Sequence, residues 1–264
     1  MSITRTLSLF AAVPLLVAGV IAAGVSYAAG PKNGLVAHYC FNSTTSTDCS
    51  SRGNNGVATG AVSLVPGILG TAAKFGGYRD LGYVTIPASP SLAFGNNFTV
   101  SYWARFDDFA GEDAFANFVP HAIQMAVAKS HDRQGFFSYI ASAPAPAPGS
   151  AGFIDYSTAV ALTTPIKPQL GKWLHVTITQ RSNPERIRLY IDGELQQTIE
   201  NGHHNFAVSN GQPLYLGAQS PLFGERTYRY PLAGALDEVR IYNRELAAIE
   251  VFLTVLSDRY GIKD

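Results

Sequence analysis

The sequence predicts an all-β domain, a sandwich or barrel of short strands, with one helix near the C-terminus. Short stretches of alternating apolar and polar residues, rich in β-branched and aromatic side chains, recur along the chain. This period of two is typical of strands with one buried face. Glycine, proline and asparagine separate the stretches, as they do in β-sandwiches and barrels.

The composition excludes several classes of protein. The 264 residues include 19 basic and 19 acidic side chains, and this charge balance argues against a nucleic-acid-binding or polybasic membrane-surface protein. Aromatic residues make up 11% of the chain, which is unlike a disordered protein. Two cysteines are too few for a disulfide-dense small fold or a four-thiolate zinc site.

Residues 1–28 are predicted to be a secretory signal peptide, and residues 29–264 a single domain. Arg5 supplies the positive charge, Leu7–Val25 is uncharged, and Ser26-Tyr27-Ala28 has the small residues of a cleavage site. The uncharged run is also long enough to be an uncleaved anchor helix. No second run of this length exists, so we expect no membrane span after cleavage. The expected location is secreted, periplasmic or at the cell surface.

Export predicts the state of the cysteines. Oxidising compartments favour disulfides, and we therefore expect Cys40 and Cys49 to pair. The loop that they close is short, so the chain-entropy model gives roughly 2–3 kcal/mol. Two unpaired buried thiols are the alternative.

The strands are predicted in chain order from these stretches. The segment from Trp173 to Thr179 places Leu174, Val176 and Ile178 on one face and His175 on the other. We assign both tryptophans, Trp103 and Trp173, to the core. The predicted strands are 35–41, 56–62, 72–76, 82–86, 98–105, 123–129, 136–141, 152–156, 173–179, 186–191, 194–198, 213–217 and 232–242.

Two connections carry specific signals. Asp192-Gly193 stands between two alternating segments and predicts a tight hairpin, because a type I′ turn needs positive φ at both central positions. Residues 142–149 contain alternating prolines, which lack ladder donors. We interpret this stretch as an expanded hairpin connection.

The last segment predicts the helix. Leu246, Ile249, Leu253, Leu256 and Tyr260 recur at helical spacing, which predicts one apolar face packed on the sandwich. Asn243 is a suitable N-cap, and Gly261 stands where a terminating glycine belongs.

A series of short motifs follows one order along nearly the whole mature chain. The most specific is Gly234–Leu246, which reads Gly-Ala-Leu-Asp-Glu-Val-Arg-Ile-Tyr-Asn-Arg-Glu-Leu. The others are Gly34–Tyr39, Asp48–Gly56, Gly67–Phe75, Tyr83–Pro87, Asn97–Trp103, Gly171–Val176 and Leu189–Gly193.

In this order, the motifs resemble the LamG-like jelly-roll family of the concanavalin A-like lectin/glucanase superfamily. The resemblance covers about 34–250 and implies a two-sheet antiparallel jelly-roll sandwich. The segment 106–170 matches poorly. The paired acidic residues that the family carries near 79–81 are replaced here by Arg79-Asp80-Leu81.

The superfamily contains glycan-cleaving enzymes as well as lectins, so catalysis has to be considered. Retaining β-glucanases of this fold place two carboxylates about 5–5.5 Å apart on one face of a strand. The nearest acidic pair in a predicted strand, Asp237-Glu238, is adjacent and points to opposite faces. The sequence therefore favours a non-catalytic protein.

The resemblance also implies a structural calcium ion. Calcium prefers carboxylate, amide and carbonyl oxygens, and Asp48, Asn54 and Asp237 are the candidate ligands. In the alternating strand pattern, Asp237 falls on the same face as Val239 and Ile241, which predicts that its side chain points inward. A buried carboxylate needs an ion or hydrogen-bond donors. The alternative is that Asp48 and Asn54 stabilise a turn while Asp237 accepts backbone hydrogen bonds.

Two groups could recognise a sugar. Tyr78, Arg79 and Asp80 form one, and Arg226, Tyr228 and Tyr230 form the other. Arginine forks onto hydroxyls or carboxylates, and tyrosine offers a ring and a hydroxyl. The alternative for the tyrosines is that they close the end of the sandwich.

We therefore expect a secreted, non-catalytic binding module whose partner is a glycan or an extracellular protein. A glycan-cleaving enzyme and a purely structural surface module are the alternatives.

Overall fold

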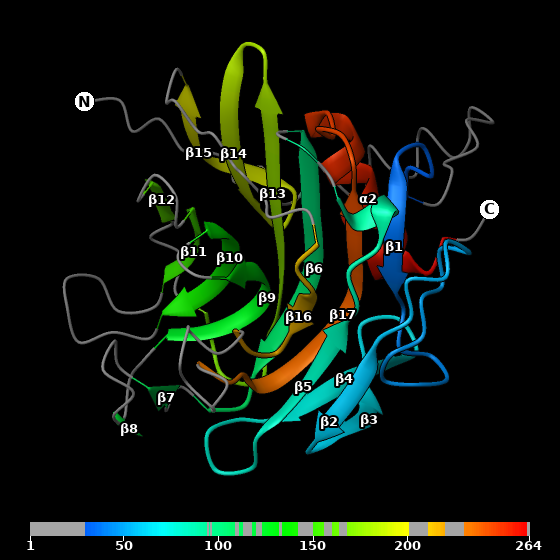
Figure 1. The fold of residues 1–264 in the computed structure, drawn as a ribbon, viewed down its shortest axis with the longest axis vertical. Coiled ribbons are helices and arrows are strands. Elements are labelled where there is room, and N and C mark those ends of the chain that lie inside the picture. The colour runs from blue at the N-terminus through cyan, green and yellow to red at the C-terminus, as the bar shows by residue number, and fades with distance from the viewer. Residues whose placement is uncertain are drawn as a thin grey trace, which may run out of the picture.

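In the residues that it describes, the computed structural model of the chain has two antiparallel β-sheets and one C-terminal α-helix (Figure 1). The structure describes residues 30–93, 95, 97–108, 111–112, 118–119, 123–131, 134–141, 150–155, 160–163, 168–200, 211–219 and 230–262. The predicted signal peptide, the proline-rich stretch 142–149, Arg226 and Tyr228 lie outside this part of the chain.

The first sheet has the strand order β15-β14-β13-β6-β17-β4-β3. Strand β1 pairs with the second half of β17, beyond the part that pairs with β4. The strands of the first sheet are β1 (Leu35–Tyr39), β3 (Val62–Pro66), β4 (Thr71–Gly76), β6 (Phe98–Phe106), β13 (Trp173–Ser182), β14 (Glu185–Ile191), β15 (Glu194–Glu200) and β17 (Ala233–Tyr242).

The second sheet has the order β12-β11-β10-β9-β16-β5-β2, with β7 and β8 attached at β9. A short 3₁₀ helix, η2 (Pro90–Leu92), follows β5. The strands are β2 (Val57–Gly60), β5 (Gly82–Ile86), β7 (Gly111–Glu112), β8 (Phe118–Val119), β9 (Ile123–His131), β10 (Gln134–Ala141), β11 (Ser150–Asp155), β12 (Val160–Thr163) and β16 (Leu214–Leu216).

The core lies between the sheets and follows the predicted alternation. In β13, Leu174, Val176 and Ile178 join the main hydrophobic cluster. Phe98 of the first sheet stacks on Phe136 of the second, with ring centroids 4.9 Å apart. The strand pattern in the sequence predicted a sandwich or a barrel, and the two sheets packed face to face show that the fold is a sandwich.

Both predicted connections are confirmed. Asp192 and Gly193 have φ values of 50° and 85°, as a type I′ hairpin turn requires. Ala141, the last residue of β10, pairs with Ser150, the first of β11. The proline-rich stretch therefore joins two adjacent antiparallel strands.

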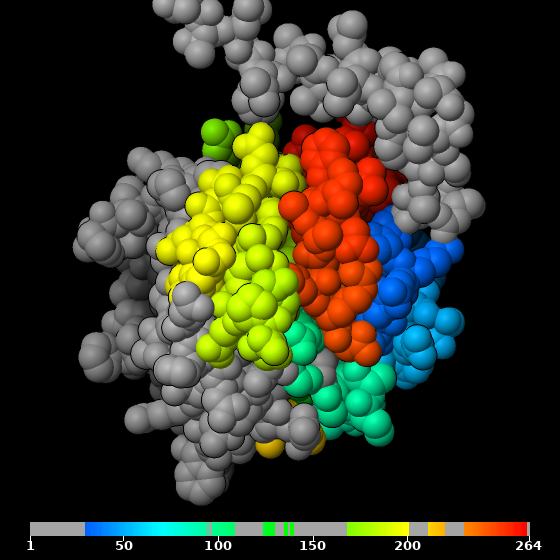
Figure 2. All heavy atoms as spheres, turned by 90° about the horizontal axis from the view of Figure 1, so that it is seen from above, coloured from blue at the N-terminus to red at the C-terminus, as the bar shows by residue number. Residues whose placement is uncertain are grey.

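The helix α2 (Ala248–Tyr260) covers the outer face of the first sheet, not the core. Figure 2 shows it between the β14–β15 hairpin and the start of the described chain. The contacts agree, because a Cβ on Gly193 would lie 3.4 Å from Phe252 and one on Gly30 would lie 3.3 Å from Thr254. Gly261 ends the helix with φ 61°, as predicted.

Two details of the helix prediction are wrong. The helix begins at Ala248, and the Glu250 carboxylate accepts the Ala247 N–H at 2.8 Å, so Asn243 is not the N-cap. The predicted apolar stripe is also only partly buried: Leu246, before the helix, is buried, but Ile249 is 61% and Tyr260 63% exposed. The buried face carries Val251, Thr254, Val255, Ser257 and Asp258, because the surface that it meets is polar.

The tryptophans behave differently from the prediction as well. Trp103 is buried, but it lies on the outer face of the first sheet under α2, where its Nε1–H donates to Asp258 at 2.9 Å. Trp173 is only half-buried, and the Arg105 guanidinium lies 5.4 Å from its ring centroid.

Candidate functional site

Asp48 organises the loop that follows β1. One carboxylate oxygen accepts the backbone N–H groups of His38 and Ser50 at 2.9 and 2.8 Å, and the other accepts that of Asn54 at 2.9 Å. The Asp48 N–H in turn donates to the side chain of Asn55 at 2.9 Å. Asp48 therefore ties the loop to β1 through backbone donors.

Asn54 joins the same loop to η2. Its side-chain amide donates to the Val36 carbonyl at 2.7 Å and to the Ser91 hydroxyl at 2.9 Å. Its side-chain oxygen accepts from the Ser89 hydroxyl at 2.5 Å. Since Asn54 is buried, these bonds replace the water that the amide would otherwise bind.

Asp237 is fully buried at a β-bulge of β17. One carboxylate oxygen accepts the N–H groups of Ile68 and Leu69 at 2.9 and 3.2 Å, and the other accepts that of Glu238 at 2.8 Å. Gly67 allows this approach, because a Cβ there would lie 2.4 Å from the carboxylate. Burial nevertheless raises the pKa of Asp237 to about 7, even though the backbone donors oppose the rise.

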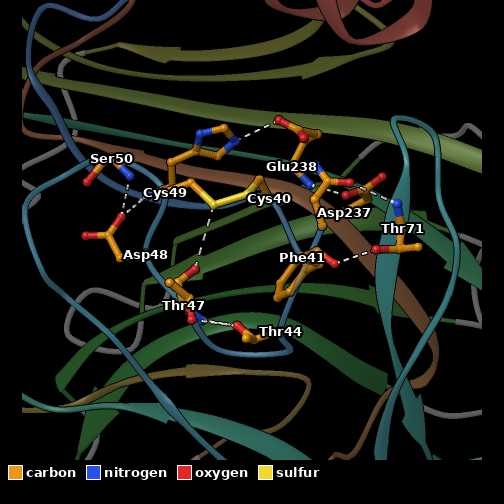
Figure 3. Close-up of a disulfide and its surroundings, with 12 residues drawn as sticks. Cys40, Phe41, Thr44, Thr47, Asp48, Cys49, Ser50, Thr71, Asp237 and Glu238 are labelled. Carbon is orange, nitrogen blue, oxygen red and sulfur yellow. Dashed lines mark hydrogen bonds and ion pairs between the residues drawn. A yellow bond between two sulfur atoms is a disulfide. The ribbon is translucent and has the colours of Figure 1, made fainter.

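The structure brings two of the three predicted calcium ligands together, since the Asn54 N–H donates to Asp48 at 2.9 Å, but Asp237 lies apart from them. Figure 3 shows Asp48 and Asp237 on either side of the Cys40–Cys49 disulfide. No cluster of three or more His, Cys, Asp or Glu side chains suited to a metal occurs in the described part of the chain. The contacts seen are those of the alternative, in which these side chains accept or donate backbone hydrogen bonds. The disulfide itself is confirmed, with Cα atoms 6.1 Å apart.

Two members of the first predicted sugar-binding group, Tyr78 and Arg79, line a surface pocket, and Asp80 does not. Tyr78, Arg79 and Asp80 lie in the β4–β5 connection and are exposed. Tyr78 and Arg79 line a pocket of about 160 Å³ together with Asp107 and Asp108, which follow β6. We call this the Tyr78 pocket; Lys74, Phe75, Gly76, Ala233 and Gly234 complete its lining.

Backbone contacts position the walls of the Tyr78 pocket. A Cβ on Gly76 would lie 2.1 Å from the Asp80 carbonyl oxygen, so the turn needs glycine there. The N–H groups of Asp107 and Asp108 donate to the Ala233 carbonyl at 2.9 and 3.4 Å. These bonds hold the acidic pair against β17.

The side chains of the Tyr78 pocket differ in whether neighbouring residues already hold them. Asp107 is held by Arg105 at 2.9 Å and by Lys74 at 3.5 Å. Arg79 makes no hydrogen bond or ion pair within the described residues. The Tyr78 ring is 41% exposed. The pocket therefore offers an aromatic face, a free guanidinium and carboxylates.

The second predicted group is only partly described. Arg226 and Tyr228 lie outside the described residues. Tyr230 is 7% exposed, and its backbone carbonyl accepts the Met125 N–H at 2.9 Å. Its buried ring is not a surface platform for a sugar, and it follows the alternative of closing the sandwich end.

A buried charged network on the outer face of the first sheet is absent from the sequence analysis. Arg240 donates to both carboxylate oxygens of Asp258, at 2.9 and 2.8 Å, and to Glu238. Glu238 also accepts a hydrogen bond from His38 at 2.7 Å. Burial raises the pKa of Glu238, but the His38 hydrogen bond and the Arg240 charge outweigh it and hold the pKa below its usual value.

His175 adjoins this network beside Trp103. The two rings meet edge to face, with centroids 5.0 Å apart, and the His175 Nε2 lies 3.0 Å from the Ser101 hydroxyl. Burial, together with the Arg240 and Arg259 charges, lowers the pKa of His175 to about 3. His175 is therefore neutral at physiological pH. The polar residues on the outward parity of β6, β13 and β17 were the available signal for this layer.

The family of the chain follows from a match over most of its length. A family model described as "Concanavalin A-like lectin/glucanases superfamily" matches residues 78–252. The chain belongs to this superfamily, in agreement with its two-sheet jelly-roll sandwich. A search of curated proteins finds no match.

Solved structures of similar fold include sugar-bound and toxin domains. Domain 4 of AbnA, an extracellular GH43 arabinanase from Geobacillus stearothermophilus, was solved with arabinotriose; it has a TM-score of 0.61 and 19% identity, over 83% of this chain and 98% of that one. The binding domain of Paraclostridial Mosquitocidal Protein 1 has a TM-score of 0.63 and 18% identity, over 86% of this chain and 52% of that one.

A botulinum neurotoxin type C structure, described by ganglioside-dependent cell entry, has a TM-score of 0.62 and 14% identity, over 87% of this chain and 52% of that one. The chain thus spans about half the length of the toxin chains. At these identities, the likeness shows the fold. In the described residues, no helix is both long and apolar enough to cross a membrane.

Proposed function

We propose that the protein is an exported, non-catalytic carbohydrate-binding module and that the Tyr78 pocket contacts the sugar. The observation that carries this proposal is the exposed Tyr78 ring beside the unpaired Arg79 guanidinium in one pocket. A sugar ring stacks its C–H face on an aromatic ring, while its hydroxyls need planar donors and acceptors. Arg79 supplies donors, and Asp108 supplies an acceptor.

The similar structures support a sugar ligand. One similar domain was solved with arabinotriose and another is described by its ganglioside interaction. A third, the botulinum neurotoxin DC binding domain, was solved with rat synaptotagmin II, which is a protein ligand. We favour the glycan because the Tyr78 pocket is small, with a volume of about 160 Å³, whereas protein interfaces need a far larger surface.

The acidic residues in β17 support a binding rather than a catalytic role. Glycosidase carboxylates must reach the scissile bond from one face. Asp237 is fully buried among backbone donors, and Glu238 is buried between His38 and Arg240. Neither carboxylate can reach a bound glycan without breaking these contacts.

Export is supported by the disulfide and by the apolar run at residues 7–25. A disulfide persists in oxidising compartments, and the arabinanase domain belongs to an extracellular enzyme. Mass spectrometry of the exported protein should show a mature chain that starts at Ala29. A chain that retains residues 1–28 would contradict cleavage and favour the anchor.

The test of the proposed function is glycan binding by pocket variants. Titration calorimetry with arabinotriose and with hits from a glycan array should show binding that weakens about tenfold in Arg79→Ala, as loss of a charge-assisted hydrogen bond predicts. Tyr78→Ala should also weaken binding, by up to about tenfold, because it removes the ring on which the sugar stacks. Tyr260→Ala is the matched control, since Tyr260 is also exposed but lies on α2.

Three results would contradict the proposal. An array on which no glycan binds, or binding that neither pocket variant weakens, would remove the Tyr78 pocket from the model. New reducing ends released from a polysaccharide panel would establish an enzyme instead. Binding to an extracellular protein in the absence of any glycan signal would favour the protein ligand.

A further inference from the structure

We propose that the Tyr78 pocket is one end of a longer sugar site on the outer face of the first sheet, and that Trp173 forms the other end. The ligand is then a chain of sugar residues rather than a single sugar ring. This inference rests on the proposed function, because it extends the same site and names the class of glycan that the site binds.

The strand register places four side chains in one row across the sheet. Trp173 of β13 pairs with Arg105 of β6, and Arg105 pairs with Ala235 of β17. Ala235 in turn pairs with Lys74 of β4. Directly paired residues share a face of the sheet, and Arg105 has the parity of Trp103, whose side chain meets α2 on the outer face. We call these four residues the Trp173 row; its last member, Lys74, also lines the Tyr78 pocket.

The Trp173 row is longer than one sugar ring. Strands β13, β6, β17 and β4 are consecutive in the sheet (Figure 1), and neighbouring strands lie about 4.7–4.9 Å apart. Three such spacings separate Trp173 from Lys74, so the row spans about 14 Å. A chain of sugar residues that lies across the strands would contact both ends, whereas a single ring would contact only one.

A guanidinium and a carboxylate occupy the middle of the Trp173 row. Arg105 donates to both carboxylate oxygens of Asp107, at 2.9 and 3.3 Å, and its guanidinium lies 5.4 Å from the Trp173 ring centroid. The Lys74 Nζ lies 3.5 Å from Asp107 on the other side. Ala235 is small and buried between them, which leaves room for the two long side chains above β17. These contacts fix the groups before a ligand binds, which lowers the entropy cost of binding.

The fixed groups keep sites that suit sugar hydroxyls. Two N–H groups of Arg105 donate to Asp107, and a guanidinium has further N–H groups to donate. Each carboxylate oxygen of Asp107 has more than one lone pair. The middle of the row can therefore donate to one hydroxyl of a sugar and accept from another, while Trp173 and Tyr78 offer aromatic faces at the two ends.

The Trp173 row is accessible from solvent. The side chains of Lys74, Asp107 and Arg105 are 45%, 30% and 20% exposed, and the Trp173 side chain is only half-buried. In the described strands, β14 pairs with β13 from Val176 onward, so Trp173 stands at the open end of its row. A ligand can reach the row without displacing α2.

Matched pairs of long and short glycans test the proposal by calorimetry. The probes are arabinopentaose, cellopentaose and chitopentaose, each with its monosaccharide: arabinose, glucose and N-acetylglucosamine. We expect at least one pentasaccharide to bind about tenfold or more tightly than its monosaccharide, as about 1.4 kcal/mol of added contacts predicts. Trp173→Ala should weaken that pentasaccharide by up to about tenfold, because it removes an aromatic face, and should leave the monosaccharide unaffected.

Tryptophan fluorescence gives a second readout that needs no variant. The chain contains two tryptophans, and Trp103 is 1% exposed under α2, so quenching by acrylamide reports mainly on Trp173. A bound pentasaccharide should protect the emission from acrylamide, and a monosaccharide should not. Ile249→Ala is the matched control for calorimetry, since Ile249 is 61% exposed on the first turn of α2, and it should leave every affinity unchanged.

Failure of this inference and failure of the proposed function give different results. Equal binding of pentasaccharide and monosaccharide, lowered by Arg79→Ala but not by Trp173→Ala, would keep the Tyr78 pocket as a sugar site and refute the extension to Trp173. Binding of none of these probes and of no glycan on an array would overturn both proposals. If Trp173→Ala does not fold, a bound pentasaccharide that leaves acrylamide quenching unchanged would still refute the extension.

Discussion

Replacing Asp258 by asparagine should destabilise the protein by about 3–5 kcal/mol, the cost of breaking a buried ion pair from one side. Asp258 accepts two hydrogen bonds from Arg240, at 2.8 and 2.9 Å, and one from Trp103 at 2.9 Å. The asparagine amide would face these donors with a donor of its own. Glu238 remains beside Arg240, so the lower end of the range is expected.

Urea unfolding followed by circular dichroism gives the magnitude. The midpoint should fall in Asp258→Asn while the slope stays constant, as for a change in stability alone. Lys74→Gln is the control, because it removes an exposed pair at 3.5 Å from Asp107. Exposed pairs contribute about 0–1 kcal/mol. A loss in Asp258→Asn no larger than that of the control would refute the role assigned to the buried pair.

A double variant separates the ion pair from simple packing. In Arg240→Met with Asp258→Leu, both charges are replaced by apolar side chains of similar volume. Such replacements are often neutral or stabilising. We therefore expect the double variant to be more stable than Asp258→Asn. The Glu238 carboxylate, which loses the Arg240 charge but keeps the His38 bond, limits the recovery.

Three further predictions address the loop, the buried histidine and the predicted ion. Reducing the Cys40–Cys49 disulfide should lower the free energy of unfolding by roughly 2–3 kcal/mol in the chain-entropy model. The melting temperature should therefore fall when reductant is added. The reductant should have no such effect on a variant in which serine replaces both cysteines. The pKa of His175 is lowered to about 3 in the folded protein, so as the pH falls the unfolded chain binds a proton at this residue before the folded protein does. The free energy of unfolding should therefore fall as the pH drops from about 6.5 toward 3. A His175 ring that titrates near pH 6.5 by NMR in the folded protein would contradict this. The melting temperature should be equal in calcium and in chelator, since the Asp237 and Asp48 oxygens already accept backbone N–H groups; a rise in calcium that is lost in Asp237→Ala would instead establish the ion.

Most of the strands were predictable because their signal is local, although none was predicted at β7, β8 or β12. Alternation in β13 placed Leu174, Val176 and Ile178 in the core, and Asp192-Gly193 marked a turn that needs two positive φ values. Both features depend on neighbouring residues alone. The disulfide was predictable because the chain contains only two cysteines.

The candidate site was predictable in part. Tyr78 and Arg79 were identified by residue type, and the structure adds Asp107 and Asp108 from the end of β6. The acidic pair is about 30 residues away along the chain, and it reaches the pocket because its N–H groups bind the Ala233 carbonyl. Tyr230 has the same residue type as Tyr78 but is buried. Residue type alone does not distinguish an exposed tyrosine that could bind a ligand from a buried tyrosine that packs inside the protein.

The positions of most strands along the chain, the tight hairpin and the presence of a final helix follow from the amino-acid pattern, since backbone geometry imposes periods of two and 3.6 on it. The orientation of that helix does not follow. Its most apolar stripe faces outward at Ile249 and Tyr260, and its inner face carries Asp258. The reason is that Asp258 accepts hydrogen bonds from residues on two strands of the sheet: Arg240 of β17, 18 residues away, and Trp103 of β6, 155 residues away. Only folding of the sheet brings those two side chains to one surface, and a buried carboxylate is stable only where such donors already stand.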